Sequence, residues 1–184
     1  MSHPNILNSI DTVLVVIDMQ DALLKAIHER DRVVANTVRL IEAAKIFSIP
    51  ILVTLQYADR LGDCMQAVAD ALPHSSKIDK MTFSCCGNES FLDVLRETKR
   101  CQVLLCGVES HVCVNQTAHD LLSQGYSVHL AKDAISSRTS DNWITGIEKM
   151  RDSGCVITST ETAIFELTKD ASSAKFKQIL PLVK

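Results

Sequence analysis

Glycine, proline and aromatic residues are scarce in this sequence. Its 184 residues include 6 glycines and 4 prolines, and aromatic side chains make up 4% of the chain. So few glycines and prolines exclude a collagen-like fibre and leave no room for a Pro- or Gly-rich linker between domains. We expect regular structure joined by short connections, in a single domain over residues 1–184.

Excess positive charge and long apolar runs are also lacking. The formal net charge is −3, so no global positive field attracts nucleic acid or an anionic membrane surface. The longest uninterrupted apolar run, residues 13–17, is far too short to span a membrane. We therefore expect no nucleic-acid partner and no membrane partner. Residues 1–9 carry no arginine and no apolar stretch, so we also expect no secretory signal.

The cysteines do not pair into a recognisable framework. There are seven, an odd number, and no two are spaced as Cys-x-x-Cys. Secreted proteins that depend on disulfides use even sets of cysteines, so reduced thiols fit this chain better. We expect a cytoplasmic location, with association with mitochondria left open.

Short β-branched runs alternate with helical periodicity along the chain. Residues 12–17 read as a strand buried on both faces, and residues 32–47 repeat apolar side chains at helical spacing. The other expected strands are 51–55, 78–83 (or the exit of a strand), 101–106, 126–131 and 155–158, and the other expected helices are 62–72 (a loop with a short helix), 89–98, 111–124, 141–152, 160–167 and 174–180. This alternation predicts an α/β fold, with helices on both faces of a parallel sheet of five or six strands.

Polar residues directly after the strands are the candidates for chemistry, because open parallel sheets bind ligands beyond the carboxyl ends of their strands. Asp18 follows the first strand and is either an ordered general base or a cap of the next helix. Lys80 either balances a carboxylate and a thiolate in the crevice or is a solvated surface lysine, the commoner fate of a single lysine.

Cys113 falls in the expected first turn of a helix. Unpaired N–H groups and the positive dipole end at that place lower a thiol's pKa, and the same N–H groups can hold an oxyanion. A small buried core cysteine explains the position equally well. Cys85 or Cys86 is expected to line the crevice near Lys80, whereas the spacing of His111 and His119 disfavours a Cys–His dyad.

No metal and no cofactor are expected. Gln56-Tyr57-Ala58-Asp59 follows the second strand, and the next histidine along the chain is His74, so a carboxylate with two imidazoles is missing there. The motifs GxGxxG, GxxxxGK[ST], HExxH and GxSxG are absent, which argues against dinucleotide, P-loop, zincin and α/β-hydrolase functions.

Taken together, three segments resemble the isochorismatase-like cysteine hydrolase superfamily. They are Val15-Val-Ile-Asp18-Met-Gln20, Lys80, and Gly107-Val-Glu-Ser-His-Val-Cys113-Val114. The likeness runs nearly end to end and is closest to the eukaryotic isochorismatase domain-containing proteins. Gln56-Tyr57 with Leu61-Gly62, Leu104-Leu-Cys-Gly-Val-Glu109, Asp133-Ala-Ile-Ser-Ser-Arg138 and Met150-Arg-Asp-Ser-Gly154 resemble motifs of that subgroup.

The resemblance implies a three-layer fold with six parallel strands and a triad of Asp18, Lys80 and Cys113. In amidase members the Asp takes the thiol proton, the Lys supports the charged pair and the Cys attacks a carbonyl carbon. The resemblance also implies a cis peptide at Val108–Glu109, with the N–H groups of Glu109 and Cys113 as an oxyanion hole. The residues expected to line the substrate pocket are Gln20, Gln56, Tyr57 and Phe83.

Departures from the family's motifs narrow the range of reactions that the resemblance implies. The metal cluster of the nicotinamidases is absent, and the presence of Cys113 favours thiol chemistry over vinyl-ether cleavage. The leading hypothesis is hydrolysis of a C–N bond in a small amide-like substrate through a thioester, by a protein that forms homo-oligomers. A catalytically silent binding or scaffold protein is the alternative, and a nuclease is the weaker third. Glu109 repels anionic substrates if its carboxylate faces the pocket, and is structural if it faces away.

Overall fold

A central sheet of six parallel strands organises the protein. The computed structural model describes residues 3–72 and 77–184. The strands lie in the order β3-β2-β1-β4-β5-β6. Their bounds are β1 (Thr12–Ile17), β2 (Ile51–Gln56), β3 (Lys77–Lys80), β4 (Gln102–Val108), β5 (Ser127–Ser136) and β6 (Val156–Thr158). The expected six-stranded parallel sheet is therefore confirmed.

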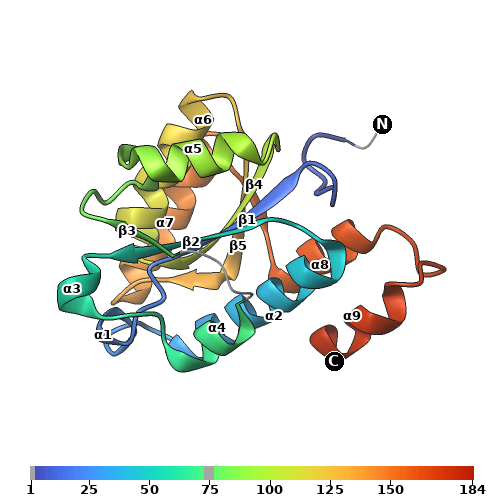
Figure 1. The fold of residues 1–184 in the computed structure, drawn as a ribbon, viewed down its shortest axis with the longest axis horizontal. Coiled ribbons are helices and arrows are strands. Elements are labelled where there is room, and N and C mark those ends of the chain that lie inside the picture. The colour runs from blue at the N-terminus through green and yellow to red at the C-terminus, as the bar shows by residue number, and fades with distance from the viewer. Residues whose placement is uncertain (1–2, 73–76) are drawn as a thin grey trace.

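Helices cover both faces of this sheet (Figure 1). The longer ones are α2 (Arg30–Phe47), α5 (Glu89–Glu97), α6 (Asn115–Ser123), α7 (Ser140–Asp152), α8 (Thr160–Thr168) and α9 (Phe176–Val183). The short ones are α1 (Asp21–Leu24), α3 (Ala58–Leu61) and α4 (Gln66–Ala71). Helices α5, α6 and α7 lie on one face, and α2, α4, α8 and α9 lie on the other.

Two hydrophobic cores follow from the pleat of the strands. Successive side chains of a strand point to opposite faces, so Val13, Val15 and Ile17 join one core while Leu14 and Val16 join the other. All six residues of β1 are buried. The continuous apolar run of the sequence therefore becomes the middle of a sheet that is covered on both sides.

The strand order reverses beside β1, and this places the candidate site. The chain runs outward from β1 to β2 and β3, then crosses to β4 on the other side of β1. Residues that follow β1 and β4 consequently meet at the point where open α/β sheets bind ligands. Asp18 follows β1 directly, and Cys113 lies in a π-helical turn, η2 (Ser110–Val114), shortly after β4.

Several elements differ from their expected bounds. Strand β3 ends at Lys80, so Met81 to Ser84 leave the sheet before a 3-10 turn, η1 (Cys85–Gly87). Strand β5 continues to Ser136 past a register shift opposite β4. Helix α9 starts later than expected and continues through Pro181, and its apolar side packs in the core that α2 lines. The apolar C-terminal segment is thus docked on its own chain.

Candidate active site

Asp18 lies fully buried at the carboxyl end of β1. Its backbone has a φ of 52°, in the left-handed region that non-glycine residues seldom adopt. One carboxylate oxygen accepts a hydrogen bond from the Thr54 hydroxyl at 2.8 Å, and the other accepts from Lys80 Nζ at 2.7 Å. A buried carboxylate needs such donors, so Thr54 and Lys80 together satisfy and orient both oxygens of Asp18.

Lys80 is the buried cation of this site and not a surface lysine. Besides Asp18, its Nζ donates to Gln56 Oε1 at 2.7 Å and to the Thr82 carbonyl at 3.4 Å. Burial by itself lowers the pKa of Lys80, but the Asp18 carboxylate, helped by Cys113 and Cys85, raises the pKa above its ordinary value overall. The ammonium therefore stays charged, with all three protons engaged.

Cys113 lies beside this ion pair and is 7% exposed. Burial first, and then the Asp18 charge, raise the pKa of the Cys113 thiol to about 12, against the smaller opposing effect of Lys80. This differs from the lowered pKa expected for a helix N-terminus. The reason is local: Cys113 lies inside a short π-helical turn, where burial and a neighbouring carboxylate outweigh the helix dipole. The resting residue is therefore a neutral thiol beside the Asp18 carboxylate.

The backbone before Cys113 is tightly constrained. The Val108–Glu109 peptide bond is cis, and Gly107 has a φ of +114°. A Cβ added to Gly107 would lie 2.0 Å from the carbonyl oxygen of Ile17, so only glycine allows β1 and β4 to approach so closely. The Glu109 carbonyl accepts from Val112 and Val114, while the Glu109 N–H makes no hydrogen bond within residues 3–72 and 77–184.

The Glu109 carboxylate is neutralised by an arginine. Its Oε2 accepts from both the Nε and the backbone N–H of Arg138, each at 3.0 Å. The Glu109 side chain is 14% exposed and that of Arg138 is 60% exposed. The sequence left open whether this carboxylate faces the pocket or has a structural role. In the structure it binds Arg138, in the segment that follows β5, which is the structural role.

The residues expected to line the substrate pocket divide into two pairs. The Gln20 amide is fully buried and bonds the backbone of Gln56 and Gly62, so it ties together the segments that follow β1 and β2. The Gln56 amide joins Lys80 to the Met81 carbonyl. In contrast, Tyr57 and Phe83 are 37% and 54% exposed. They follow β2 and β3, and so present apolar surface at the edge of the sheet where Asp18, Lys80 and Cys113 lie.

The sequence did not single out Thr54, which lies beside Asp18. Thr54, buried in the middle of β2, holds Asp18 and also contacts Cys85 Sγ at 3.8 Å. It is the one hydroxyl in the otherwise apolar run of residues 51–55, and that was the available signal. Cys85 is fully buried next to the site, and burial raises its pKa to about 11.

The described part of the chain offers neither a metal cluster nor a membrane-spanning helix. Within residues 3–72 and 77–184, no three His, Cys, Asp or Glu side chains gather as a metal site would require. His74 lies outside the described residues. None of the described helices combines the length and the apolar character needed to cross a bilayer.

Comparison with known proteins fixes the family. The isochorismatase domain model matches residues 12–162, which contain the whole candidate triad. The chain belongs to the isochorismatase family. This confirms the resemblance carried by the three sequence segments and makes the protein a member of a hydrolase family.

Relatives of this family member cover almost all of the chain. The secreted isochorismatase effector Isc1 of Phytophthora sojae is 41% identical over 177 residues, which are 94% of this chain and 84% of the relative. Isochorismatase domain-containing protein 2 of Danio rerio is 35% identical over 94% of this chain and 86% of its own length. Among solved structures, one described as the MAR1 ribonuclease of Caenorhabditis elegans has a TM-score of 0.91 at 35% identity and covers 96% of this chain and 91% of that one.

Proposed function

We propose that this isochorismatase family member is a cysteine hydrolase that cleaves the C–N bond of a small, uncharged amide. The observation that supports this most strongly is the buried Asp18–Lys80 ion pair, with a nitrogen–oxygen distance of 2.7 Å, beside the thiol of Cys113. A buried ion pair is a poor source of stability compared with apolar side chains. Its position next to the Cys113 sulfur favours a role in catalysis.

In the first step, Asp18 takes the thiol proton as Cys113 Sγ attacks the carbonyl carbon, and the carbonyl electrons move to the oxygen. Lys80 then balances the negative charge that passes between sulfur and carboxylate. The N–H groups of Glu109 and Cys113 serve as donors to the oxyanion. Collapse of this intermediate breaks the C–N bond. The amine leaves with the proton from Asp18, and the acyl group stays on sulfur as a thioester.

In the second step, water hydrolyses the thioester. Asp18 removes a proton from the water molecule as the water oxygen attacks the acyl carbon. The C–S bond then breaks, the proton returns to sulfur, and the carboxylic acid departs. Atoms and charges balance without a metal or a redox partner. The raised pKa of Cys113 suits this sequence, because the thiolate forms as substrate is attacked and not beforehand.

The charges around the thiol support an uncharged substrate. The charge of Lys80 is neutralised by Asp18, its Nζ also donates to Gln56, and Arg138 is bound by Glu109. Neither cation is therefore open to pair with a substrate carboxylate without breaking an existing ion pair. Tyr57, Met81 and Phe83 add exposed apolar surface at the same edge of the sheet. An apolar acyl group fits this surface.

The proposal is tested by screening small amides for ammonia or amine release. We expect hydrolysis of neutral amides by the wild-type protein, weaker hydrolysis of analogues that carry a carboxylate near the carbonyl, and no turnover by Cys113→Ala. Cys101→Ala is the matched control, because Cys101 is exposed at the amino end of β4. A protein that binds amides without hydrolysing them would instead be the silent scaffold.

The screen also includes RNA, since the Caenorhabditis elegans relative is described as a ribonuclease. A net charge of −3 provides little attraction for a polyanion. We expect no cleavage of RNA above that of Cys113→Ala. Cleavage that depends on Cys113 would replace the amidase proposal with a nuclease.

A further inference from the structure

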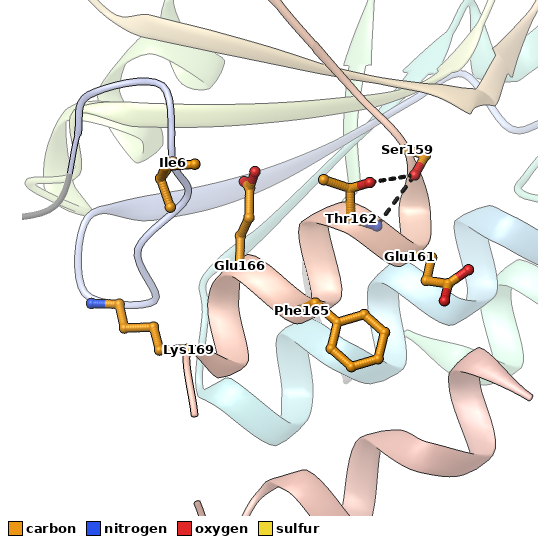
Figure 2. Close-up of a pocket in the computed structure, with 7 residues that line it drawn as sticks. All are labelled: Ile6, Ser159, Glu161, Thr162, Phe165, Glu166 and Lys169. Atoms are coloured by element: carbon orange, nitrogen blue, oxygen red, sulfur yellow. Dashed lines mark hydrogen bonds between the residues drawn. The ribbon is translucent and has the colours of Figure 1, made fainter. Parts of the chain in front are cut away.

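The cavity beside α8 is lined by residues other than those of the candidate active site. Its volume is about 660 Å³, and Figure 2 shows its lining side chains, which come from the N-terminal segment and from α8 and its flanking residues. The hydrogen bonds drawn there join Ser159 to Thr162 and cap the start of α8. They stabilise a helix and point to no ligand. A polar side chain with an unassigned role lies instead beside Lys80.

Gln56 is the uncharged partner of the buried Lys80 ammonium. Its Oε1 accepts from Lys80 Nζ at 2.7 Å, the same distance that separates Nζ from Asp18 Oδ2. The other end of the amide, Nε2, donates to the Met81 carbonyl at 3.0 Å. This second bond fixes the orientation of the amide, because a flipped amide would turn its NH2 group toward the ammonium. Lys80 is therefore held from two sides.

The backbone of Gln56 is fixed as well as its side chain. Gln56 lies opposite Lys80 in the pairing of β2 with β3. Its N–H donates to Gln20 Oε1 at 2.8 Å, and its carbonyl accepts from Gln20 Nε2 at 3.0 Å. Gln20 is itself fully buried, two residues after Asp18. The segment after β1 thus carries one member of the ion pair and, through Gln56, holds the other in place.

The neutral amide of Gln56 preserves the charge balance of the site. When the thiol proton moves to Asp18, the negative charge passes from the carboxylate to the Cys113 sulfur, and the Lys80 ammonium compensates it in both states. Buried charge without a partner is costly, so this compensation matters at every step. A carboxylate in place of the Gln56 amide would compete for the same ammonium. An uncharged acceptor holds the lysine without dividing its charge.

We propose that Gln56 is a positioning residue of the hydrolase and not a wall of its substrate pocket. Its amide holds Lys80 where the ammonium compensates the charge of Asp18 and then of the Cys113 sulfur. This role rests on the cysteine hydrolase function proposed above. Its effect on the Cys113 thiol is nevertheless measurable without any substrate, because a Lys80 ammonium held in place lowers the pKa of that thiol.

The first test is the rate at which iodoacetamide alkylates Cys113 at pH 8, followed by mass spectrometry of the peptide that contains it. Gln56→Met has a side chain of similar length but no acceptor, so the lysine is held less well and alkylation slows by about threefold. Gln56→Glu keeps the acceptor but divides the charge, and alkylation slows by about tenfold. Gln178→Glu, the same change at an exposed position of α9, leaves the rate unchanged. Alkylation of Gln56→Met at or above the wild-type rate overturns the proposal.

The second test is the steady-state kinetics of Gln56→Met with a neutral amide. We expect kcat to fall by about tenfold while KM stays within about twofold, because the ammonium loses a close partner and the substrate loses none. A raised KM with unchanged kcat is the result for a pocket wall, and it overturns the proposal. Circular dichroism and the thermal midpoint show that the variants compared are folded. A wild type that hydrolyses no amide contradicts the hydrolase, and the alkylation rates then still decide whether Gln56 holds Lys80.

Discussion

The Cys113 thiol is subject to opposing influences from its two charged neighbours. The Asp18 carboxylate raises its pKa and the Lys80 ammonium lowers it, while burial supports the neutral form. The geometry thus separates the reactivity of the resting thiol from its ability to attack a substrate with the help of a base. A resting thiolate reacts quickly with alkylating reagents, whereas the proposed mechanism needs only a base that takes the proton during attack.

This separation predicts opposite effects of a single substitution. Asp18→Asn removes the charge that raises the pKa of Cys113, so alkylation by iodoacetamide at pH 8 becomes faster than in the wild type. Amide hydrolysis falls by roughly a hundredfold or more, because the general base is gone. Rates of alkylation and of hydrolysis, measured on the same preparation, check the prediction. Parallel loss of both activities would mean that Asp18 only maintains the fold.

Thr54 supplies the second hydrogen bond to the buried carboxylate, at 2.8 Å. Thr54→Val preserves the shape of the side chain but leaves one Asp18 oxygen without a donor, at a cost of about 1–3 kcal/mol in the free energy of unfolding. Thr54→Ser keeps the hydroxyl and serves as the control. Urea denaturation measures both. A valine variant as stable as the serine variant would show that the hydrogen bond contributes nothing to stability.

The sequence singled out Asp18, Lys80 and Cys113 because they stand in the segments that carry the family resemblance, and the structure brings them together. Their catalytic roles stay a prediction, and their hydrogen-bond partners were not predicted. The contacts of Gln56 with Lys80 and of Thr54 with Asp18 depend on which strands are neighbours and in which register, for instance the pairing of Gln56 with Lys80 across β2 and β3. A single sequence does not reveal which residues of two neighbouring strands lie opposite each other. The residues around Cys113 in the sequence likewise did not predict its raised pKa, which depends on burial.

Among the secondary-structure elements, the N-terminal segment is held where β4 and β5 begin. Leu7 is fully buried, and Gln102 Nε2 donates to the carbonyls of Pro4 and Ile6. His129 of β5 lies beneath this segment with its ring buried, and burial lowers its pKa to about 4 despite a contact with the Pro4 backbone. The segment therefore covers a histidine that must stay neutral.

Protonation of His129 predicts a loss of stability in acid. The unfolded histidine binds a proton near pH 6.5 and the folded one only near pH 4, so its contribution to stability is complete above pH 6.5 and is lost as the pH falls toward 4. The shift corresponds to roughly 3 kcal/mol. His129→Gln flattens this part of the pH profile. Denaturation between pH 7 and pH 4 provides the measurement, and equal slopes for the two proteins would contradict it.

The predicted ends of helices and strands were wrong where tertiary contacts outweigh the local sequence pattern. Residues 78–83 were expected to form one strand, yet the chain leaves the sheet after Lys80, whose side chain bonds Asp18 and Gln56. The expected helix over residues 111–124 begins instead as a π-helical turn after the cis peptide. Proline at position 181 is tolerated within α9, where the sequence suggested an earlier end. In each case the deciding contact is distant in sequence.

At the scale of the whole molecule, the apolar strand runs and their alternation with helices were enough to predict a three-layer fold. The same architecture brings Asp18, Lys80 and Cys113 together from three separate parts of the chain, because the carboxyl ends of β1, β3 and β4 lie at one edge of the sheet. The prediction of a cytoplasmic location stays a prediction, and the Phytophthora sojae relative is described as secreted. The homo-oligomer expected from the family resemblance also stays a prediction.

The central claim is that Cys113 carries the acyl group of an amide substrate during turnover. The most direct measurement is acid quenching of the enzyme during steady-state hydrolysis of a neutral amide, followed by mass spectrometry of the peptide that contains Cys113. We expect the acyl mass on that peptide, its loss in hydroxylamine, and no turnover by Cys113→Ala. Unmodified Cys113 together with wild-type turnover by Cys113→Ala would contradict it.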